Sequence, residues 1–573
     1  MSKKHSLAKA IFFLVLGILL MFAEFSAAQE VQVADIPPTL VRESVAALPS
    51  APIRELLAKG VHPRLRWGRF PDFQPQLQQL YERNGFNPLW IRDGGPTPQA
   101  RIIAASLGKA NQNGLDPADY DADLLGREVK SVTPATKPRE IASLDVALSL
   151  SAMRYLSSLY LGRVNPRRAN FGFSIEQKKV DLSVLIEKIS RSDNPQGLVE
   201  GMAPKLPLYG RLKEALARYR TLSGLEVPAM SFGRKLSPGG HHKDIPALRR
   251  YLAAIGDLKE PQAETADSEL YDPALVAAVK SFQERHGLAT DGIIGKGTVT
   301  ALQIPTADRI NQIQLGLERL RWLPSELLAP YLVVNIPSFE LYGSRNGEGL
   351  GHQDLKMNVI VGQATSGRNT PVFHADMTYV TFHPYWNVPS TIAAKELVPA
   401  LQRNPGYLAR HNMEIVSGYS ARAAVYAPTS QNIARLASGS LRIRQRPGAA
   451  NALGLVKFAF PNDNSIYLHS TPSKGLFNRA RRDFSHGCIR VQEPSKLAEW
   501  VLAEEEGWTR KRIESAMAAR APRTVTLKKP IPVYVFYSTV LADEDGRVRF
   551  FEDIYGHDRT LAKLLAKGFP YSS

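Results

Sequence analysis

The spacing of apolar residues changes near Trp322, and this change constrains the fold more than any other feature of the chain. Between residues 65 and 230, apolar side chains recur at the three- and four-residue intervals of amphipathic helices. Beyond Trp322 they alternate or form short runs, as in Tyr331–Ile336, Lys356–Val361 and Met377–Phe382, which is typical of strands. A chain of 573 residues is also too long for one ordinary core. We therefore expect an α+β protein of several domains.

Two helical regions are predicted before the change of spacing. Residues 65–243 are expected to form a helical scaffold domain. Residues 244–304 are expected to form a small three-helix domain, with a glycine-containing turn at Asp291–Gly295. The helices predicted there are Ile245–Leu252, Pro273–His286 and Thr298–Leu302. Residues 305–330 are expected to be a linker or a return to the scaffold.

The second half is expected to be a mainly β domain over residues 331–540, followed by an extension over residues 541–573. Strand character resumes at Lys457 and again at Pro532–Tyr537, and a helix is predicted between them over Glu493–Glu504. Residues 388–450 have helical and loop-like spacing instead. They predict a helical subdomain inserted within the β domain.

The first 28 residues have the pattern of a secretory signal peptide. A basic start ending at Lys9 precedes the apolar run Ala10–Phe22, and the small residues Ser26–Ala28 mark a cleavage site. The run is shorter than the roughly 20 residues that span a bilayer, although an uncleaved signal would serve as a membrane anchor. Residues 29–64, rich in Pro and Ala, are expected to be a tether. The remainder is expected to lie outside the cytoplasm.

Charge and cysteine content narrow the classes of partner and chemistry. The formal net charge is +18, and nucleic acid is the usual partner of so basic a protein. An exported chain rarely meets nucleic acid and always faces an anionic envelope, so the charge alone specifies no ligand. Cys488 is the only cysteine and cannot form an internal disulfide. A lone thiol in an oxidising compartment is either buried and inert or required for chemistry.

Two segments around Cys488 alternate apolar residues with chemically functional ones. Successive side chains of a strand point to opposite faces. Tyr467 and His469 therefore share one face of the first segment, and Cys488 and Arg490 share one face of the second. The residues expected to face the core are Ile466, Leu468, Ile489 and Val491. Burial of these rows would bring the functional side chains together over a groove.

The residue types in this pattern suit acyl transfer. Thiolate is the reactive form of cysteine, and a nearby histidine such as His469 can accept its proton. Gly487 lacks a Cβ, so a substrate carbonyl can approach the backbone closely. The N–H groups of Gly487 and Cys488 would then stabilise a tetrahedral oxyanion. The pattern predicts a thioester intermediate on Cys488.

His469 followed by the motif Ser485–Cys488 resembles the signature of the YkuD-type L,D-transpeptidases. The resemblance implies Cys488 as the nucleophile and His469 as the general base, with His486 as a second candidate participant. Many members have Asn at the position of Arg490, although an Arg variant also occurs. We expect Arg490 to meet an anionic group of the substrate.

Other segments extend the resemblance over nearly the whole mature chain. His383–Pro389 and Arg446–Phe458 are similar to segments that border the active site in a large multidomain subgroup, in which a capping subdomain interrupts the catalytic domain. Asp244–Ile304 is similar to the small peptidoglycan-binding domain of wall enzymes. The substrate-binding candidates are Tyr467, Arg490, Trp386, Asn387 and Ser485.

The resemblance implies a periplasmic L,D-transpeptidase, anchored to the inner membrane if the signal is retained. Cys488 would take up the acyl group of the third residue of a tetrapeptide stem and release the terminal D-alanine. An amine of a neighbouring stem would then resolve the thioester as a 3-3 cross-link. Peptidoglycan stems and glycan are the expected partners, together with other wall-synthesis enzymes. No metal, organic cofactor or nucleic acid is implied.

The sequence does not separate this function from several others. The same acyl-enzyme would act as a carboxypeptidase with water, exchange D-amino acids, or attach a lipoprotein through its lysine. A wall-binding protein without catalysis would not need intact His469, Gly487 and Cys488. A papain-like protease has its nucleophile before its histidine, which is the reverse of the order here.

Overall fold

The computed structural model describes residues 50–568 apart from positions 177, 229, 231–234, 260–267, 347–353, 366, 405 and 421. The predicted signal peptide and most of the predicted tether lie outside these residues. The described part of the chain contains four hydrophobic cores, and none of its helices is long and apolar enough to cross a membrane. The predicted multidomain α+β class is confirmed.

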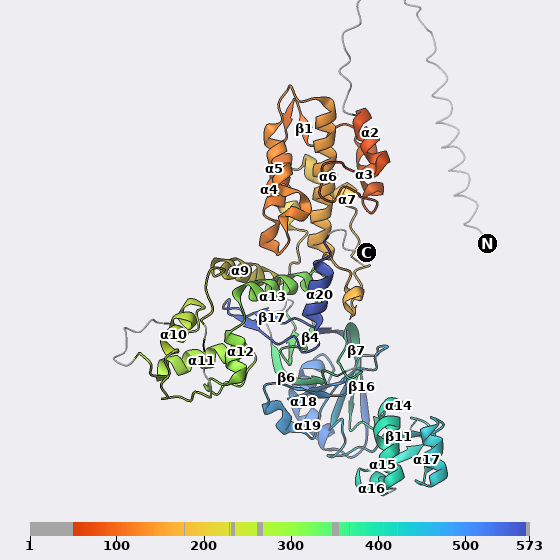
Figure 1. Ribbon diagram of the computed structural model, residues 1–573. Helices are drawn as coiled ribbons and strands as arrows, with labels where there is room; N and C mark the ends of the chain where they lie inside the picture. The colour runs from red at the N-terminus through yellow and green to blue at the C-terminus, as the bar shows by residue number, and fades with distance from the viewer. Residues whose placement is uncertain are drawn as a thin grey trace, which may run out of the picture. The chain divides into compact units, whose positions relative to one another are not determined.

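The first core belongs to a helical region in which α6, Pro138–Leu161, contacts α2, α4, α5 and α7 (Figure 1). Asp145 of α6 is fully buried, and its carboxylate accepts the backbone N–H groups of Leu89 and Trp90 at 3.0 and 2.8 Å and the Tyr81 hydroxyl at 2.7 Å. These bonds tie the loop before β1 to the central helix. The other elements of this region are α2 Ser50–Lys59, α3 Gln74–Arg83, β1 Ile91–Arg92, β2 Gly95–Pro96, α4 Pro98–Gly108, α5 Ala122–Ser131, α7 Leu182–Arg191 and α8 Pro195–Glu200.

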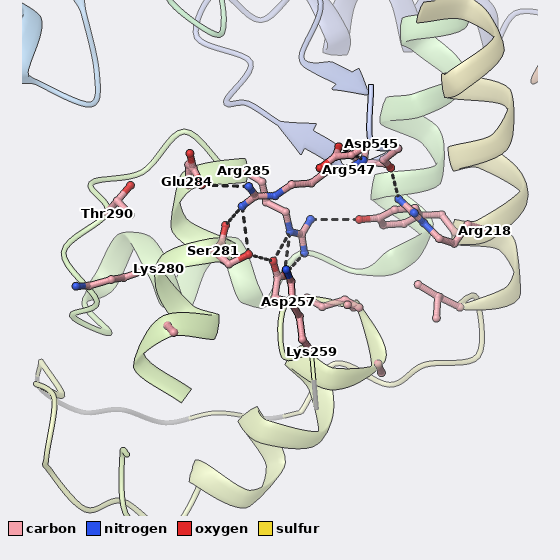
Figure 2. A pocket seen from close by; sticks show the side chains of 18 residues that line it. Arg218, Asp257, Lys259, Lys280, Ser281, Glu284, Arg285, Thr290, Asp545 and Arg547 are labelled. Atoms are coloured by element: carbon pink, nitrogen blue, oxygen red, sulfur yellow. Dashed lines mark hydrogen bonds and ion pairs between the residues drawn. The ribbon is translucent and has the colours of Figure 1, made fainter. Parts of the chain in front are cut away.

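The three-helix domain has a small core of its own. Its helices, α10 Ile245–Ala254, α11 Pro273–Arg285 and α12 Lys296–Leu302, confirm the three that the sequence predicts. The Asp272 carboxylate accepts the Leu275 N–H and so caps the start of α11. Figure 2 shows the polar side of this domain, where Arg285 pairs with the carboxylate of Asp257 beside a cleft of about 630 Å³.

The β domain is a ten-stranded sheet that closes on itself. β12 pairs with β13 on one side and with the long strand β7 on the other, so no open edge remains between them. The strands are β3 Phe171–Gly172, β4 Tyr331–Asn335, β5 Glu340–Ser344, β6 Leu355–Gly362, β7 Val372–Phe382, β12 Val456–Ala459, β13 Leu468–His469, β14 Asp483–Ser485, β15 Ile489–Val491 and β16 Arg523–Phe536. Helices α18 Pro494–Val501 and α19 Arg510–Ala518 pack against this core, and α18 lies within the helix predicted over residues 493–504.

Three further helices share the core of the sheet domain. They are α9 Pro207–Thr221, α13 Thr306–Leu320 and α20 His557–Leu565. The hairpin β17 Val540–Ala542 and β18 Val548–Phe550 contacts α9 and α13. α9 lies within the range predicted as scaffold, and α13 lies within the range predicted as linker. The apolar faces of both helices are therefore buried with the sheet, while the domain boundaries drawn from the sequence stay predictions.

The insertion between β7 and β12 differs from the prediction of a helical subdomain. It contains α14 Ser390–Ile392, α15 Val398–Arg403, α16 Tyr407–Arg410 and α17 Ser430–Ala437, but also a four-stranded sheet in the order β10-β9-β11-β8. Those strands are β8 Trp386–Asn387, β9 Met413–Val416, β10 Val425–Tyr426 and β11 Arg442–Gln445. Strands of two to four residues are too short to establish an alternating pattern, which explains why the sequence did not predict them.

Replacing Asp257 by Asn should destabilise the three-helix domain, because Arg285 would stay buried without a counter-charge. The Arg285 Nε lies 2.9 Å from each Asp257 oxygen, and the two side chains are 5% and 3% exposed. Removing one partner of such a pair costs about 3–5 kcal/mol. We expect faster hydrogen exchange of the α10 and α11 amides.

The control is Glu284→Gln, which breaks an exposed ion pair between α11 of the same domain and Arg547, the residue before β18. Arg547 Nη1 lies 3.1 Å from Glu284 Oε2 (Figure 2). The Glu284 side chain is 63% exposed. Its loss should change stability by less than about 1 kcal/mol. Equal exchange rates in the two variants would contradict the assignment of the buried pair as the stronger contact.

Candidate active site

Three neighbouring strands place functional side chains on one face of the sheet. β13 pairs with β15 in parallel, with His469 opposite Arg490, and with β12 in antiparallel, with Lys457 opposite His469. The Ile489 N–H donates to the Tyr467 carbonyl at 3.1 Å, which brings Tyr467 beside Cys488. This face of the three strands therefore combines a thiol, a phenol, an imidazole and two cations.

The opposite face of the same strands is apolar and lies in the core. The four residues that the alternation predicts to face inward are between 0% and 7% exposed: Ile466, Leu468, Ile489 and Val491. Because the side-chain period of a strand is two, their burial turns the intervening residues to the other face. The hydrophobic core thus determines which side chains meet over the site.

His469 is held as a neutral base. It is 4% exposed, and its Nδ1 lies 2.6 Å from the Ser470 carbonyl. A carbonyl oxygen only accepts hydrogen bonds, so Nδ1 carries the proton and Nε2 is the unprotonated nitrogen of the neutral ring. The ring also forms a backbone hydrogen bond with Leu453. Burial, reinforced by the cations of Arg490 and Lys457, lowers the pKa of His469 to about 3. The imidazole is therefore neutral at physiological pH and able to accept a proton at Nε2.

Several neighbouring groups act on the pKa of the Cys488 thiol, and their effects oppose one another. Burial raises the pKa of the Cys488 thiol above its ordinary value, and the hydrogen bonds with Tyr467 and the positive charges of Lys457 and Arg490 offset this effect only in part. The Sγ lies 3.8 Å from the Ser465 carbonyl, a weak contact for a thiol donor. Tyr467 also forms a side-chain hydrogen bond with Trp386, at the base of the insertion. The aromatic pair connects the insertion to the thiol.

The loop before Cys488 is fixed by two hydroxyl groups. Ser485 Oγ donates to the Cys488 carbonyl at 2.5 Å and accepts the Gly487 N–H at 3.1 Å. Thr370 Oγ1 donates to the Gly487 carbonyl at 2.7 Å and accepts the Gly362 N–H at 2.8 Å. The predicted oxyanion role of the Gly487 N–H is therefore not available in this conformation, because Ser485 already occupies that donor.

His486 is exposed and engaged elsewhere. Its Nε2 lies 2.9 Å from Glu396 Oε1, and Arg368 donates to the same oxygen at 2.8 Å. Glu396 belongs to the π-helical turn Ala393–Leu397 of the insertion. The contact joins the insertion to the cysteine motif through a surface ion pair, so this geometry gives His486 a bridging contact.

The remaining candidates differ in what they contact. Arg490 has a buried Nε without a hydrogen-bond partner, which suits an incoming anion. Asn387 is exposed, and its backbone pairs with Arg444 inside the insertion sheet. It makes no side-chain hydrogen bond to the other candidates in the described ranges. No group of three or more His, Cys, Asp or Glu within those ranges is placed to hold a metal ion.

Three residues of this neighbourhood were not singled out from the sequence. Lys457 is flanked by Val456 and Phe458, so strand alternation alone could have placed it beside His469. Thr370 and Glu396 lie 117 and 90 residues from their partners in the cysteine motif. Contacts of such separation leave no local signal, because only the closed sheet and the insertion bring these side chains together.

Comparison with known protein families gives three matches. Residues 75–216 match a scaffold domain, residues 241–302 a "Putative peptidoglycan binding domain", and residues 329–533 the YkuD L,D-transpeptidase catalytic domain. The last range contains both His469 and Cys488. The chain thus contains an L,D-transpeptidase catalytic domain and a peptidoglycan-binding domain, which confirms the resemblance seen in the sequence.

A relative from Haemophilus influenzae carries the name "Putative L,D-transpeptidase". It is 33% identical over 280 residues, which cover 48% of this chain and 54% of the relative. The chain therefore spans about half the length of the curated relative it matches. The similarity applies only to the matched region of each chain.

Gly487→Ala should strain the cysteine loop. Gly487 has a φ of +122°, a region that side-chain-bearing residues rarely adopt, and a Cβ there would lie 3.4 Å from Ile466. Such backbone strain costs about 1–3 kcal/mol. We expect a lower thermal midpoint and a changed rate of Cys488 alkylation. Gly475→Ala, where a Cβ meets nothing within 4 Å, is the control, and an equal response of the two variants would contradict the strain argument.

Proposed function

We propose that this protein is a peptidoglycan L,D-transpeptidase that forms 3-3 cross-links through a thioester on Cys488. One observation carries the proposal: a neutral His469, with Nδ1 held by the Ser470 carbonyl, and Cys488 lie on the same face of neighbouring strands, in a domain that matches the L,D-transpeptidase catalytic domain. A nucleophile beside a base whose tautomer is fixed by a third group is the arrangement that nucleophilic catalysis requires.

In the first step, Cys488 Sγ attacks the carbonyl carbon of the third residue of a tetrapeptide stem. The thiol proton passes to His469 Nε2 and then to the departing amine of D-alanine, as the C–N bond breaks. The Cys488 N–H, which has no protein acceptor in the described part of the chain, is the backbone donor proposed for the oxyanion. Ser485 supports it by holding the Cys488 carbonyl.

In the second step, an amine of a neighbouring stem attacks the thioester carbonyl. Its proton passes to His469, the C–S bond breaks, and the proton returns to the sulfur. The product is a peptide bond between the third residues of two stems. Water in place of the amine would give a hydrolysed tripeptide, so the outcome depends on which nucleophile reaches the thioester first.

The other parts of the chain support wall substrates. The peptidoglycan-binding domain would hold the enzyme on glycan or stem peptides, and the net charge of +18 favours an anionic wall. Domains that act on peptidoglycan place the protein outside the cytoplasm, and we propose the periplasm, reached through the signal sequence. The insertion, joined to the site through Trp386 and Glu396, is proposed to cover the groove and exclude water.

Cys488→Ala should abolish covalent capture of a carbapenem, since no other thiol exists in the chain. His469→Ala should slow capture by about 10²–10⁴-fold, the usual contribution of a general base. Mass spectrometry of the intact protein measures both. An adduct on Cys488→Ala would remove the nucleophile assignment, and a greater loss in His486→Ala would exchange the roles of the two histidines.

Tetrapeptide-rich sacculi should yield dimers joined between two third residues, detected by mass analysis of muropeptides. Pentapeptide-only sacculi should yield few, because the leaving group differs. A version with a shortened insertion should shift products from dimers to tripeptide monomers while Cys488 still reacts, since water would enter the groove.

Two outcomes would overturn the proposal in different ways. Tripeptide monomers alone from the wild-type protein would indicate a carboxypeptidase. Binding to sacculi without any product or adduct would indicate a wall-binding protein without catalysis.

A further inference from the structure

The peptide group between Gly487 and Cys488 is held by a side chain from outside the cysteine motif. Thr370 Oγ1 donates to the Gly487 carbonyl at 2.7 Å and accepts the Gly362 N–H at 2.8 Å. A hydroxyl carries one proton, so the bond from Gly362 leaves that proton for the Gly487 carbonyl. Thr370 is 1% exposed, so this arrangement is shielded from bulk water.

The orientation of the Gly487 carbonyl also sets the direction of the Cys488 N–H. The two groups belong to one planar peptide, and in a trans peptide they point in opposite directions. Among the described residues the cis bond is Ala329–Pro330, so the bond between Gly487 and Cys488 is trans. Gly487 lacks the side chain that would otherwise limit rotation of this plane. The bond from Thr370 therefore restricts where the Cys488 N–H points.

Tyr555 holds Thr370 in place. Its hydroxyl accepts the Thr370 N–H at 3.2 Å and donates to the Gly362 carbonyl at 2.5 Å. Burial raises the pKa of Tyr555 to about 12, so the side chain remains a phenol that can both donate and accept. Its backbone N–H donates to the Tyr537 hydroxyl at 3.0 Å, and that hydroxyl donates to Asp553 at 2.7 Å.

This support comes from outside the range that matches the catalytic domain. That range ends at residue 533, whereas Tyr555 lies between β18 and α20. Asp553 Oδ2 accepts the Asp558 N–H at 3.0 Å, near the start of α20, and this bond ties the segment to a helix that shares the core of the sheet domain. The predicted C-terminal extension thus makes contacts that reach the cysteine motif.

We infer that Thr370, supported by Tyr555, aims the Cys488 N–H at the oxyanion of the acyl-transfer intermediate. Thr370 is then a positioning residue, since it acts through the backbone and touches no substrate atom. The inference rests on the proposed function, in which the Cys488 N–H is the oxyanion donor. Ser485 occupies the Gly487 N–H, which leaves the Cys488 N–H for this role. Without the Thr370 hydroxyl, the peptide plane could rotate and turn that donor away from the substrate oxygen.

Two reactions of Cys488, the only thiol of the chain, separate this role from general support of the loop. When the thiol opens a carbapenem, a C–S bond forms, the ring C–N bond breaks and the thiol proton ends on the ring nitrogen. Negative charge develops on the carbonyl oxygen on the way. Displacement of iodide from iodoacetamide forms a C–S bond at a saturated carbon and creates no oxyanion. An oxyanion donor therefore stabilises the first reaction and not the second.

Thr370→Val should slow the limiting rate of carbapenem acylation by about 10- to 100-fold, up to the lower end of the loss on removing an oxyanion donor. Its alkylation rate and the carbapenem concentration for half-maximal rate should stay close to wild type. Thr370→Ser should restore most of the acylation rate, and Tyr555→Phe should have a smaller effect of the same kind. Thr560→Val removes a hydroxyl that donates to the Gly556 carbonyl at 3.1 Å and should change neither rate. Mass spectrometry of the intact protein follows both reactions.

The inference is overturned if Thr370→Val slows acylation and alkylation by the same factor, or changes neither, or if Thr370→Ser fails to restore acylation. Should Thr370→Val not fold, Tyr555→Phe makes the same comparison between the two reactions, and an unchanged ratio of rates has the same meaning. A carbapenem adduct that forms at a rate independent of Thr370 leaves the transpeptidase proposal standing. A wild-type protein that alkylates but forms no carbapenem adduct would overturn that proposal and this inference with it.

Discussion

Burial of one apolar face of β13 and β15 is the constraint on which the candidate site depends. Leu468 and Ile489 are opposite each other in the core, and this pairing sets the register that brings Cys488 beside Tyr467 and Arg490 beside His469. A slip by one residue would turn both functional rows inward and expose the apolar ones. The closed sheet prevents such a slip, because β12 is paired on both sides.

The electrostatics of the site follow from this packing. His469 is buried between two cations and hydrogen-bonded at Nδ1, so it is a neutral base at physiological pH. Burial raises the pKa of the Cys488 thiol, and the charges of Lys457 and Arg490 offset this effect only in part, so the thiol needs a base.

The sequence predicted those parts of the structure that repeat at a regular interval. The helices of the three-helix domain and the buried rows around His469 and Cys488 have clear periodicity, and the structure has them where expected. The short strands of the insertion lack enough residues for a period. The bond from the Gly487 N–H to Ser485 depends on a turn that no pattern specifies. Thr370 and Glu396 reach the site only through tertiary contacts, so no local signal could identify them.

A transpeptidase of this kind must pass through a stem peptide acylated on Cys488, and that intermediate can be trapped. The protein would be mixed with a purified tetrapeptide stem, quenched in acid within seconds, digested and analysed by mass spectrometry. We expect a tripeptide acyl group on the peptide that contains Cys488, together with one released D-alanine per acylated protein. D-alanine release without acylation of Cys488, or an acyl group on another residue, would contradict it.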